Sequence, residues 1–311
     1  MIRRRRLLTI AAAAAAAGAV AFPAAMRAGP TRLYQWRGVA LGADASITLA
    51  HPRAEAIVER ALAEITRLEA IFSLHRPDSA LARLNANGRL DAPPFELLEC
   101  LSLCGAVHRA SDGAFDPTVQ PLWALHAESH AAGQAPGDAQ IAAMLPRIGW
   151  RHLRFDAGAI AFARPGMALT LNGVAQGVIA DRVATLLQGE GLDDVLINTG
   201  EFRALGGHPD GGGWPITLAD GQTPPGRVAL SARALASSGP LGTTFDTDGR
   251  VGHIIDPRNG RPTTPRWHLV SVTAPRAGLA DALSTAACLM DRPAIARLVA
   301  SFPGARLAGL A

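Results

Sequence analysis

Residues 171–177 read LNGVAQG and combine a strand end, a glycine turn and a helix start. Residues 169–171 have the apolar character of a short strand that enters a glycine turn, and residues 176–188 then follow the helical period until Gly189 ends the helix. Free backbone N–H groups at such a helix start attract phosphate, and the glycines allow a carbonyl to turn toward a cation. The stretch lacks the full dinucleotide-binding fingerprint and the P-loop lysine, so neither of those nucleotide-binding classes is supported. Alone, it is also compatible with a turn that binds nothing.

The same kind of periodicity predicts further strands and helices on both sides of this stretch. We expect strands at residues 33–39, 45–50, 152–155, 160–163, 195–198, 227–233, 252–255 and 269–273. We expect helices at residues 52–72, 94–110, 279–290 and 293–301. Residues 129–138 are expected to form a loop, and residues 206–226 a loop or an irregular hairpin. Because strands and helices are mixed without a regular βαβ alternation, the sequence predicts an α+β fold.

The N-terminal residues have the order of a secretory signal. Four arginines at residues 3–6 precede an alanine-rich apolar stretch, and small residues follow it. The arginines also fit the twin-arginine type of export signal. We therefore expect a signal peptide at residues 1–28, one domain at residues 29–311 and a periplasmic location. An uncleaved membrane anchor is the alternative, because residues 7–26 are just long enough to span a membrane.

Charge and cysteine content argue against several classes of protein. All 30 basic residues are arginine, and five of them lie in residues 1–28, which hold no acidic residue. The remaining chain has 25 basic and 26 acidic residues, a formal net charge of −1, so the basic face that nucleic-acid binding requires is missing. Cys100, Cys104 and Cys288 are an odd number without zinc-ligand spacing. They favour buried small side chains over a disulfide framework or a zinc site.

Asp281 and Thr285 are candidates for a metal site. They are four residues apart in a helical pattern, which places both side chains on one face, one turn apart. A carboxylate and a hydroxyl are hard oxygen ligands, and magnesium prefers a sparse protein shell that water and phosphate complete. The alternative is structural, with Asp281 capping a helix start and Thr285 merely buried.

Two further segments suit either structure or chemistry. Residues 111–118, SDGAFDPT, follow a predicted helix and contain Asp116 before a proline, which is a common turn former. His253 lies in the short apolar strand predicted at residues 252–255, where a histidine is more often structural. As a catalyst, His253 would move a proton near neutral pH.

These segments occur in an order that resembles the FAD:protein FMN transferase family, also called ApbE, over nearly the whole of residues 29–311. No single piece is decisive, and the resemblance rests on seven pieces in the right order. The matching pieces are residues 72–73 (FS) with 76–79 (RPDS) and 84–85 (LN), 113–118 (GAFDPT), 172–177 (NGVAQG) with Asp181, 198–201 (NTGE), 237–239 (SSG), 253–257 (HIIDP) and 280–286 (ADALSTA).

The resemblance implies a fold and a role for individual residues. The fold would be α+β, with a central, mostly antiparallel sheet, flanking helices and a deep FAD cleft. Asp281 and Thr285 would bind Mg²⁺ through their side chains, and Gly173 would bind it through its carbonyl. His253 would carry the proton. The residues implied to bind FAD are Leu41, His75, Ala114, Phe115, Asp116, Thr170, Gln176 and Ile254.

The sequence departs from the family pattern at four of these positions. Leu41 stands where the family usually has methionine, and His75 where it usually has tyrosine. Thr170 stands where an acidic residue is common, and Gln176 replaces a lysine. The last change removes a positive charge near the FAD pyrophosphate, so these departures affect the expected FAD affinity and rate more than the fold.

The resemblance implies magnesium-dependent transfer of the FMN part of FAD to a threonine or serine hydroxyl of an acceptor flavoprotein, with release of AMP. Residues 172–177, the Gly-Glu pair at 200–201 and the leader are similar to the NosX branch, which comprises accessory proteins of nitrous-oxide respiration. That branch implies a membrane-bound, NosR-like acceptor. Two alternatives stay open, an FAD pyrophosphatase that gives FMN and AMP, and an FAD carrier without catalytic activity.

Overall fold

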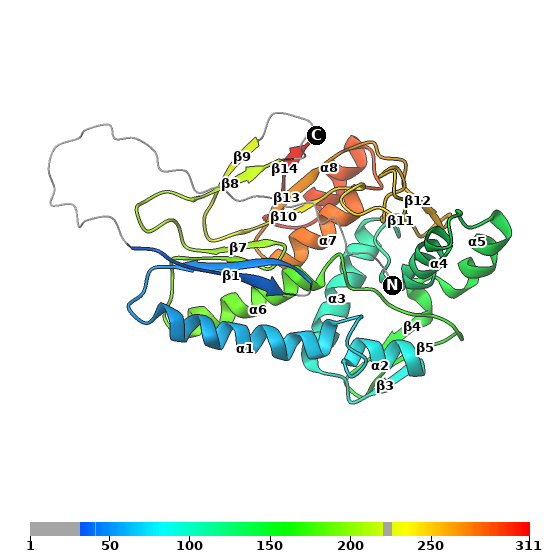
Figure 1. Ribbon diagram of the computed structural model, residues 1–311, viewed down its shortest axis with the longest axis horizontal. Coiled ribbons are helices and arrows are strands. Elements are labelled where there is room, and N and C mark those ends of the chain that lie inside the picture. The colour runs from blue at the N-terminus through cyan, green and yellow to red at the C-terminus, as the bar shows by residue number, and fades with distance from the viewer. Residues whose placement is uncertain (1–31, 41, 220–225) are drawn as a thin grey trace, which may run out of the picture.

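A seven-stranded antiparallel sheet forms the centre of the protein (Figure 1). The computed structural model describes residues 32–40, 42–219 and 226–311, so the predicted signal and Leu41 lie outside the described residues. The strands in sheet order are β1 (Tyr34–Ala40), β2 (Ala43–Leu49), β6 (Val195–Asn198), β7 (Phe202–Leu205), β10 (Ala234–Ser238), β13 (Val270–Ala274) and β14 (Arg306–Leu310). Every neighbouring pair is antiparallel, which confirms the predicted α+β class.

Helices cover one face of this sheet and enclose the main hydrophobic core (Figure 1). The helices are α1 (Ala54–Phe72), α3 (Phe95–Ala110), α6 (Ala175–Gly189), α7 (Ala277–Ala287) and α8 (Arg292–Ala300). In β10, Ala234 and Ala236 face this core, because alternate residues of a strand point to the same side. Leu235 points to the opposite face. There it packs against the hairpin of β8 (Trp214–Leu218) and β9 (Gly226–Leu230).

A smaller layer packs beside the helices and carries several of the predicted site segments. It consists of α2 (Ala80–Asn87), β3 (Arg89–Asp91), α4 (Gln120–Ala131), α5 (Asp138–Met144), β4 (Leu153–Phe155), β5 (Ala159–Phe162), β11 (Ile255–Asp256) and β12 (Arg261–Pro262). Strands β3, β5 and β4 form a three-stranded antiparallel sheet, and β11 pairs with β12.

The structure differs from the strands predicted at residues 169–171 and 252–255. Residues 169–171 belong to no strand, and the side-chain amide of Asn85 bonds Leu169 on both backbone groups as a neighbouring strand would. The amide Nδ2 donates to the Leu169 carbonyl at 2.8 Å, and Oδ1 accepts from the Leu169 N–H at 2.8 Å. In the segment predicted as a strand at residues 252–255, Gly252 forms only an isolated bridge to Thr244, and the strand β11 begins at Ile255.

Among the described residues, no helix combines the length and the hydropathy needed to cross a membrane.

Glycine at position 177 lets α6 and α7 approach within backbone contact. A Cβ on Gly177 would lie 2.4 Å from the carbonyl oxygen of Ala277, a distance that requires one helix to move. Gly189, at the other end of α6, has open space around its Cα.

We expect Gly177→Ala to lower the free energy of unfolding by about 1–3 kcal/mol, the usual range for overpacking a core. Helix propensity alone would favour alanine by about 1 kcal/mol, so a loss of stability isolates the steric effect. Gly189→Ala is the matched control and should be neutral or stabilising. Urea unfolding of both variants measures the difference, and a Gly177→Ala protein as stable as the wild type would contradict the close contact.

Candidate active site

Two aspartates connect α6 and α7, because each accepts hydrogen bonds from backbone N–H groups at the start of the other helix. Asp181 on α6 accepts hydrogen bonds from the backbone N–H groups of Ala277 and Gly278, at 2.8 and 3.0 Å. In the opposite direction, Oδ2 of Asp281 on α7 accepts from the N–H of Gly177 at 3.4 Å. Asp181 therefore caps the start of α7, because the first N–H groups of a helix have no partner within it. The contact that Asp281 makes is longer and leaves that carboxylate weakly satisfied.

The three residues predicted to bind a metal lie together at this junction. Asp281 and Thr285 are one turn apart on α7, and the turn before α6 brings Gly173 against Thr285. A Cβ on Gly173 would lie 2.8 Å from Thr285 Oγ1, so the turn needs glycine to come this close to the hydroxyl. Asp281 is buried, whereas Thr285 is half-buried.

A second carboxylate lies near Asp281. Glu201 follows the turn between β6 and β7, is buried, and accepts a hydrogen bond from the Ser237 N–H at 3.2 Å. Burial raises the pKa of Asp281 to about 8, with the Gly177 N–H acting in the opposite direction. Burial also raises the pKa of Glu201, and the negative charge of Asp281 adds to that shift. Two buried carboxyl groups that resist ionisation together provide a place where a cation is favourable.

The donor set fits Mg²⁺. A carboxylate, a hydroxyl and a backbone carbonyl are hard oxygen ligands, and the octahedral shell of magnesium leaves positions for water and phosphate. Two observations agree with this assignment. The space between Gly173 and Thr285 would be filled by a Cβ, and the Asp281 carboxylate accepts only one long hydrogen bond among those given above. Among the residues that the structure describes, no three His, Cys, Asp or Glu side chains form a metal-binding group. The predicted ligand set has one carboxylate, that of Asp281, beside the hydroxyl of Thr285 and the carbonyl of Gly173.

The raised pKa of Asp281 predicts how stability depends on pH in metal-free protein. The folded protein keeps a proton up to about pH 8 that the unfolded chain releases near its ordinary pKa of 3.8. The free energy of unfolding should therefore fall as pH rises between these two values. Thermal melts of the wild type and Asp281→Asn at pH 5 and pH 8 measure this effect, and the asparagine variant should show a smaller loss. Equal losses in both proteins would contradict the raised pKa.

His253 lies in the connection between β10 and β11. Its Nδ1 lies 3.0 Å from the carbonyl oxygen of Thr243. A carbonyl can only accept, so Nδ1 carries the proton of the neutral imidazole and Nε2 keeps its lone pair. Burial lowers the pKa of His253, with the carbonyls of Thr243 and Pro240 acting in the opposite direction, so the ring is neutral at pH 7. The same connection is held in place by Phe245, whose ring stacks on that of His126 in α4 at 5.6 Å.

The loop with Ala114, Phe115 and Asp116 is ordered by its own hydrogen bonds. Oδ1 of Asp116 accepts from the N–H and the hydroxyl of Thr118, at 2.9 and 2.6 Å, and Oδ2 accepts from the Trp150 N–H at 3.1 Å. Ala114 and Phe115 are buried beside it. The Asp116 carboxylate therefore shapes the loop, and we expect contacts of this loop with FAD to come from its backbone.

The remaining predicted FAD residues lie at the start of α6 and in three separate connections between elements. The side-chain amide of Gln176, at the start of α6, packs directly against Gly200. A Cβ on Gly200 would lie 2.5 Å from Nε2 of Gln176. Thr170 is half-buried, and its N–H donates to the Pro117 carbonyl at 2.8 Å. His75 is exposed and Ile254 is buried. Their roles toward FAD stay predictions.

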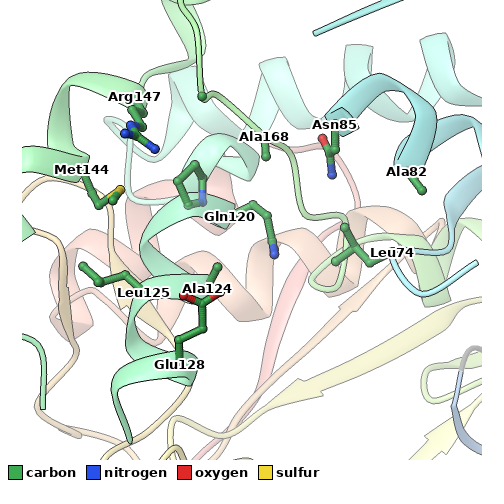
Figure 2. A pocket seen from close by; sticks show the side chains of 12 residues that line it. Leu74, Ala82, Asn85, Gln120, Ala124, Leu125, Glu128, Met144, Arg147 and Ala168 are labelled. Atoms are coloured by element: carbon green, nitrogen blue, oxygen red, sulfur yellow. The ribbon is translucent and has the colours of Figure 1, made fainter. Parts of the chain in front are cut away.

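A pocket of about 470 Å³ lies between α2 and α4 (Figure 2). Its lining combines apolar side chains with a few polar ones, a composition typical of small-molecule sites. None of the predicted FAD residues lines it, although Leu74 precedes His75 and Ala168 lies two residues before Thr170. The lining residues are Leu74, Ala82, Asn85, Gln120, Pro121, Ala124, Leu125, Glu128, Met144, Arg147, Gly166 and Ala168. The deep cleft implied by the resemblance stays a prediction.

Glu201 and Ser238 were not predicted as site residues, although both belong to segments that match the family pattern. In the structure, Glu201 lies near Asp281, and Ser238 Oγ lies 3.3 Å from Thr285 Oγ1. Glu201 follows an apolar strand and a glycine turn, a pattern that indicates a carboxylate at the end of a strand. Ser238 ends a strand of small residues, and nothing in its local pattern indicates a partner on α7.

Comparison with known proteins places this arrangement in a family. The chain matches the model of the ApbE family over residues 41–308. The FAD:protein FMN transferase of Treponema pallidum is 30% identical over 304 residues, covering 88% of this chain and 83% of that protein. The crystal structure of the ApbE protein from Thermotoga maritima superposes with a TM-score of 0.79 at 27% identity, covering 89% of this chain and 93% of that one. Apo flavinyl transferase ApbE from Pseudomonas stutzeri gives a TM-score of 0.77 at 26% identity, with coverage of 87% and 89%. The chain therefore belongs to the ApbE family.

Proposed function

We propose that this chain is a FAD:protein FMN transferase that depends on Mg²⁺. It would transfer the FMN part of FAD to a threonine or serine hydroxyl of an acceptor flavoprotein and release AMP. The observation that carries the proposal is the meeting of Gly173, Asp281 and Thr285 at the start of α6 within an ApbE fold. FAD is the donor substrate, and the family name of the relatives supports flavin transfer in general.

The proposed reaction is a phosphoryl-group displacement. The hydroxyl oxygen of the acceptor attacks the phosphorus on the FMN side of the FAD pyrophosphate, and a new P–O bond forms. The bond from that phosphorus to the bridging oxygen breaks, and AMP leaves with the oxygen. The Nε2 lone pair of His253 accepts the proton of the attacking hydroxyl. When bound, Mg²⁺ offsets negative charge on the pyrophosphate oxygens.

The residues of the chain supply binding and orientation. Asp281, Thr285 and Gly173 would hold the cation beside the N-terminus of α6, where the helix dipole favours phosphate. Gln176 offers an amide at this end where family members usually have a lysine, so phosphate binding here relies more on the helix start and the cation. The pocket beside Leu74 and Asn85 provides room for a ring of the substrate.

The location and the acceptor belong to the same proposal. Residues 1–28 support export by the twin-arginine route to the periplasm, and residues 172–177 and 200–201 support a NosR-like, membrane-bound acceptor. Cell fractionation with and without a twin-arginine translocase tests the location. Retention of the protein in the cytoplasm of translocase-competent cells would contradict it.

Mass spectrometry of an acceptor flavoprotein domain tests the transfer. After incubation with the enzyme, FAD and Mg²⁺, we expect the acceptor to gain the mass of one FMN, and we expect AMP in solution. Release of AMP without any gain of mass on the acceptor would identify a pyrophosphatase instead. Tight FAD binding with neither product, unchanged in Asp281→Ala, would identify a carrier.

A further inference from the structure

Three hydroxyl groups form a chain that ends at the predicted metal site. Ser238, the last residue of β10, has its Oγ 2.7 Å from Ser284 Oγ and 3.3 Å from Thr285 Oγ1. Ser284 Oγ donates to the backbone carbonyl of Asp281 at 3.0 Å. Ser284 is fully buried, whereas Ser238 and Thr285 are half-buried, so the chain runs from the interior to the site.

Proton counting fixes the direction of these hydrogen bonds. A hydroxyl has one proton to donate, and a carbonyl can only accept. Since Ser284 gives its proton to the Asp281 carbonyl, Ser284 Oγ accepts the proton of Ser238. Ser238 Oγ, having used its own proton, then accepts the proton of Thr285.

The consequence concerns the lone pairs of Thr285. With its proton directed at Ser238, Thr285 Oγ1 keeps its lone pairs for other partners, and Gly173 lies against this oxygen. A metal ligand must supply a lone pair, and a cation on an oxygen makes its proton a better donor. The 3.3 Å contact with Ser238 is long for a hydroxyl pair, and the donation should strengthen when a cation is bound.

We propose that Ser238 is a positioning residue for the metal ligand Thr285, acting through the hydroxyl chain that Ser284 anchors. The inference rests on the proposed function, because it assumes a divalent cation at Asp281 and Thr285. Groups behind a ligand typically change metal affinity by 10–100-fold when removed. The role is specific to this strand position, because alternate residues of β10 point to opposite faces of the sheet.

Ser237 is the matched control on the same strand. Its Oγ lies 2.7 Å from Ser271 Oγ on β13, its directly paired residue, and it points away from the helices. Ser237→Ala removes the same atom as Ser238→Ala, one residue earlier, without touching the hydroxyl chain. Ser284→Ala breaks the chain at the residue whose hydroxyl bonds Ser238 and the Asp281 carbonyl. Ser238→Thr keeps the hydroxyl.

The test is a Mn²⁺ titration of the purified full chain, followed by the electron paramagnetic resonance signal of free Mn²⁺. We expect the dissociation constant to rise about tenfold or more in Ser238→Ala, to rise less in Ser284→Ala, and to stay near wild type in Ser237→Ala and Ser238→Thr. In transfer assays, Ser238→Ala should need more Mg²⁺ for half-maximal rate while the rate at saturating Mg²⁺ stays near wild type.

Unchanged Mn²⁺ affinity in both Ser238→Ala and Ser284→Ala would overturn the inference, even if the wild type transfers FMN. Equal weakening in Ser237→Ala would also overturn it, because the effect would then come from the strand. If the predicted Mn²⁺ pattern holds but the wild type transfers no FMN, the proposed function fails and the positioning role stands. Thermal melts of each variant confirm that the titrations compare folded proteins.

Discussion

Asp281→Asn should lower the rate of FMN transfer by at least about a thousandfold at a fixed Mg²⁺ concentration. The carboxylate is the charged member of the predicted ligand set, and a bound cation supplies several kcal/mol of charge stabilisation, where each 1.36 kcal/mol is about a factor of ten in rate. Asparagine keeps the shape and retains an oxygen near the Gly177 N–H, so the fold should survive. The measurement is the initial rate of FMN addition to an acceptor domain.

Two comparisons separate a metal effect from a folding effect. Asp291→Asn removes one negative charge from the N-cap of α8, where asparagine caps as well as aspartate, and should leave the rate unchanged. Asp281→Asn should also lose Mn²⁺ binding while melting at least as high as the metal-free wild type at pH 8, because it removes a buried acid with a raised pKa. A rate within tenfold of wild type would exclude Asp281 as the main ligand.

His253→Asn should lower kcat by roughly 10²–10⁴-fold, the usual contribution of a general base. Asparagine is chosen because its Nδ2 occupies a position close to that of histidine Nδ1. The variant can therefore keep the hydrogen bond to the Thr243 carbonyl while it loses the Nε2 lone pair. FAD affinity should change little. The measurements are single-turnover transfer and FAD binding by fluorescence.

The pH profile distinguishes proton transfer from a packing role of His253. Burial keeps the pKa of the ring below its ordinary value of 6.5, so the wild type should stay active at pH 6.5 and lose activity only at lower pH. That acid limb should be absent in His253→Asn, since the variant has no imidazole to protonate. A variant with wild-type kcat, or with the acid limb intact, would show that another group accepts the proton.

Helices and strands with a clear side-chain period were the elements found most closely from the sequence. Helix α1 buries Val58, Ala61, Ile65 and Leu68, which recur at helical spacing, so its bounds were predicted closely. Strand β10, with the sequence ALASS, was missed because small residues on both sides of a central strand give no alternation. Helix α4 was missed as well, because its apolar side chains do not gather on one face.

The features of the candidate site also differ in how far the sequence predicts them. Local patterns predicted the features that lie within one element. These are the i, i+4 pair of Asp281 and Thr285, the glycine turn before α6, and the helix that follows it. These features depend on backbone geometry over a few residues, which local side chains control.

Tertiary structure alone decided which segments meet. It placed Gly173 against Thr285, Glu201 near Asp281, and Ser238 at the end of a hydroxyl chain from α7. It also gave Asp181 a capping role and raised the pKa of Asp281, since burial depends on every element packed around a side chain. Contacts between distant segments arise only when the sheet and helices pack, so no local pattern carries them.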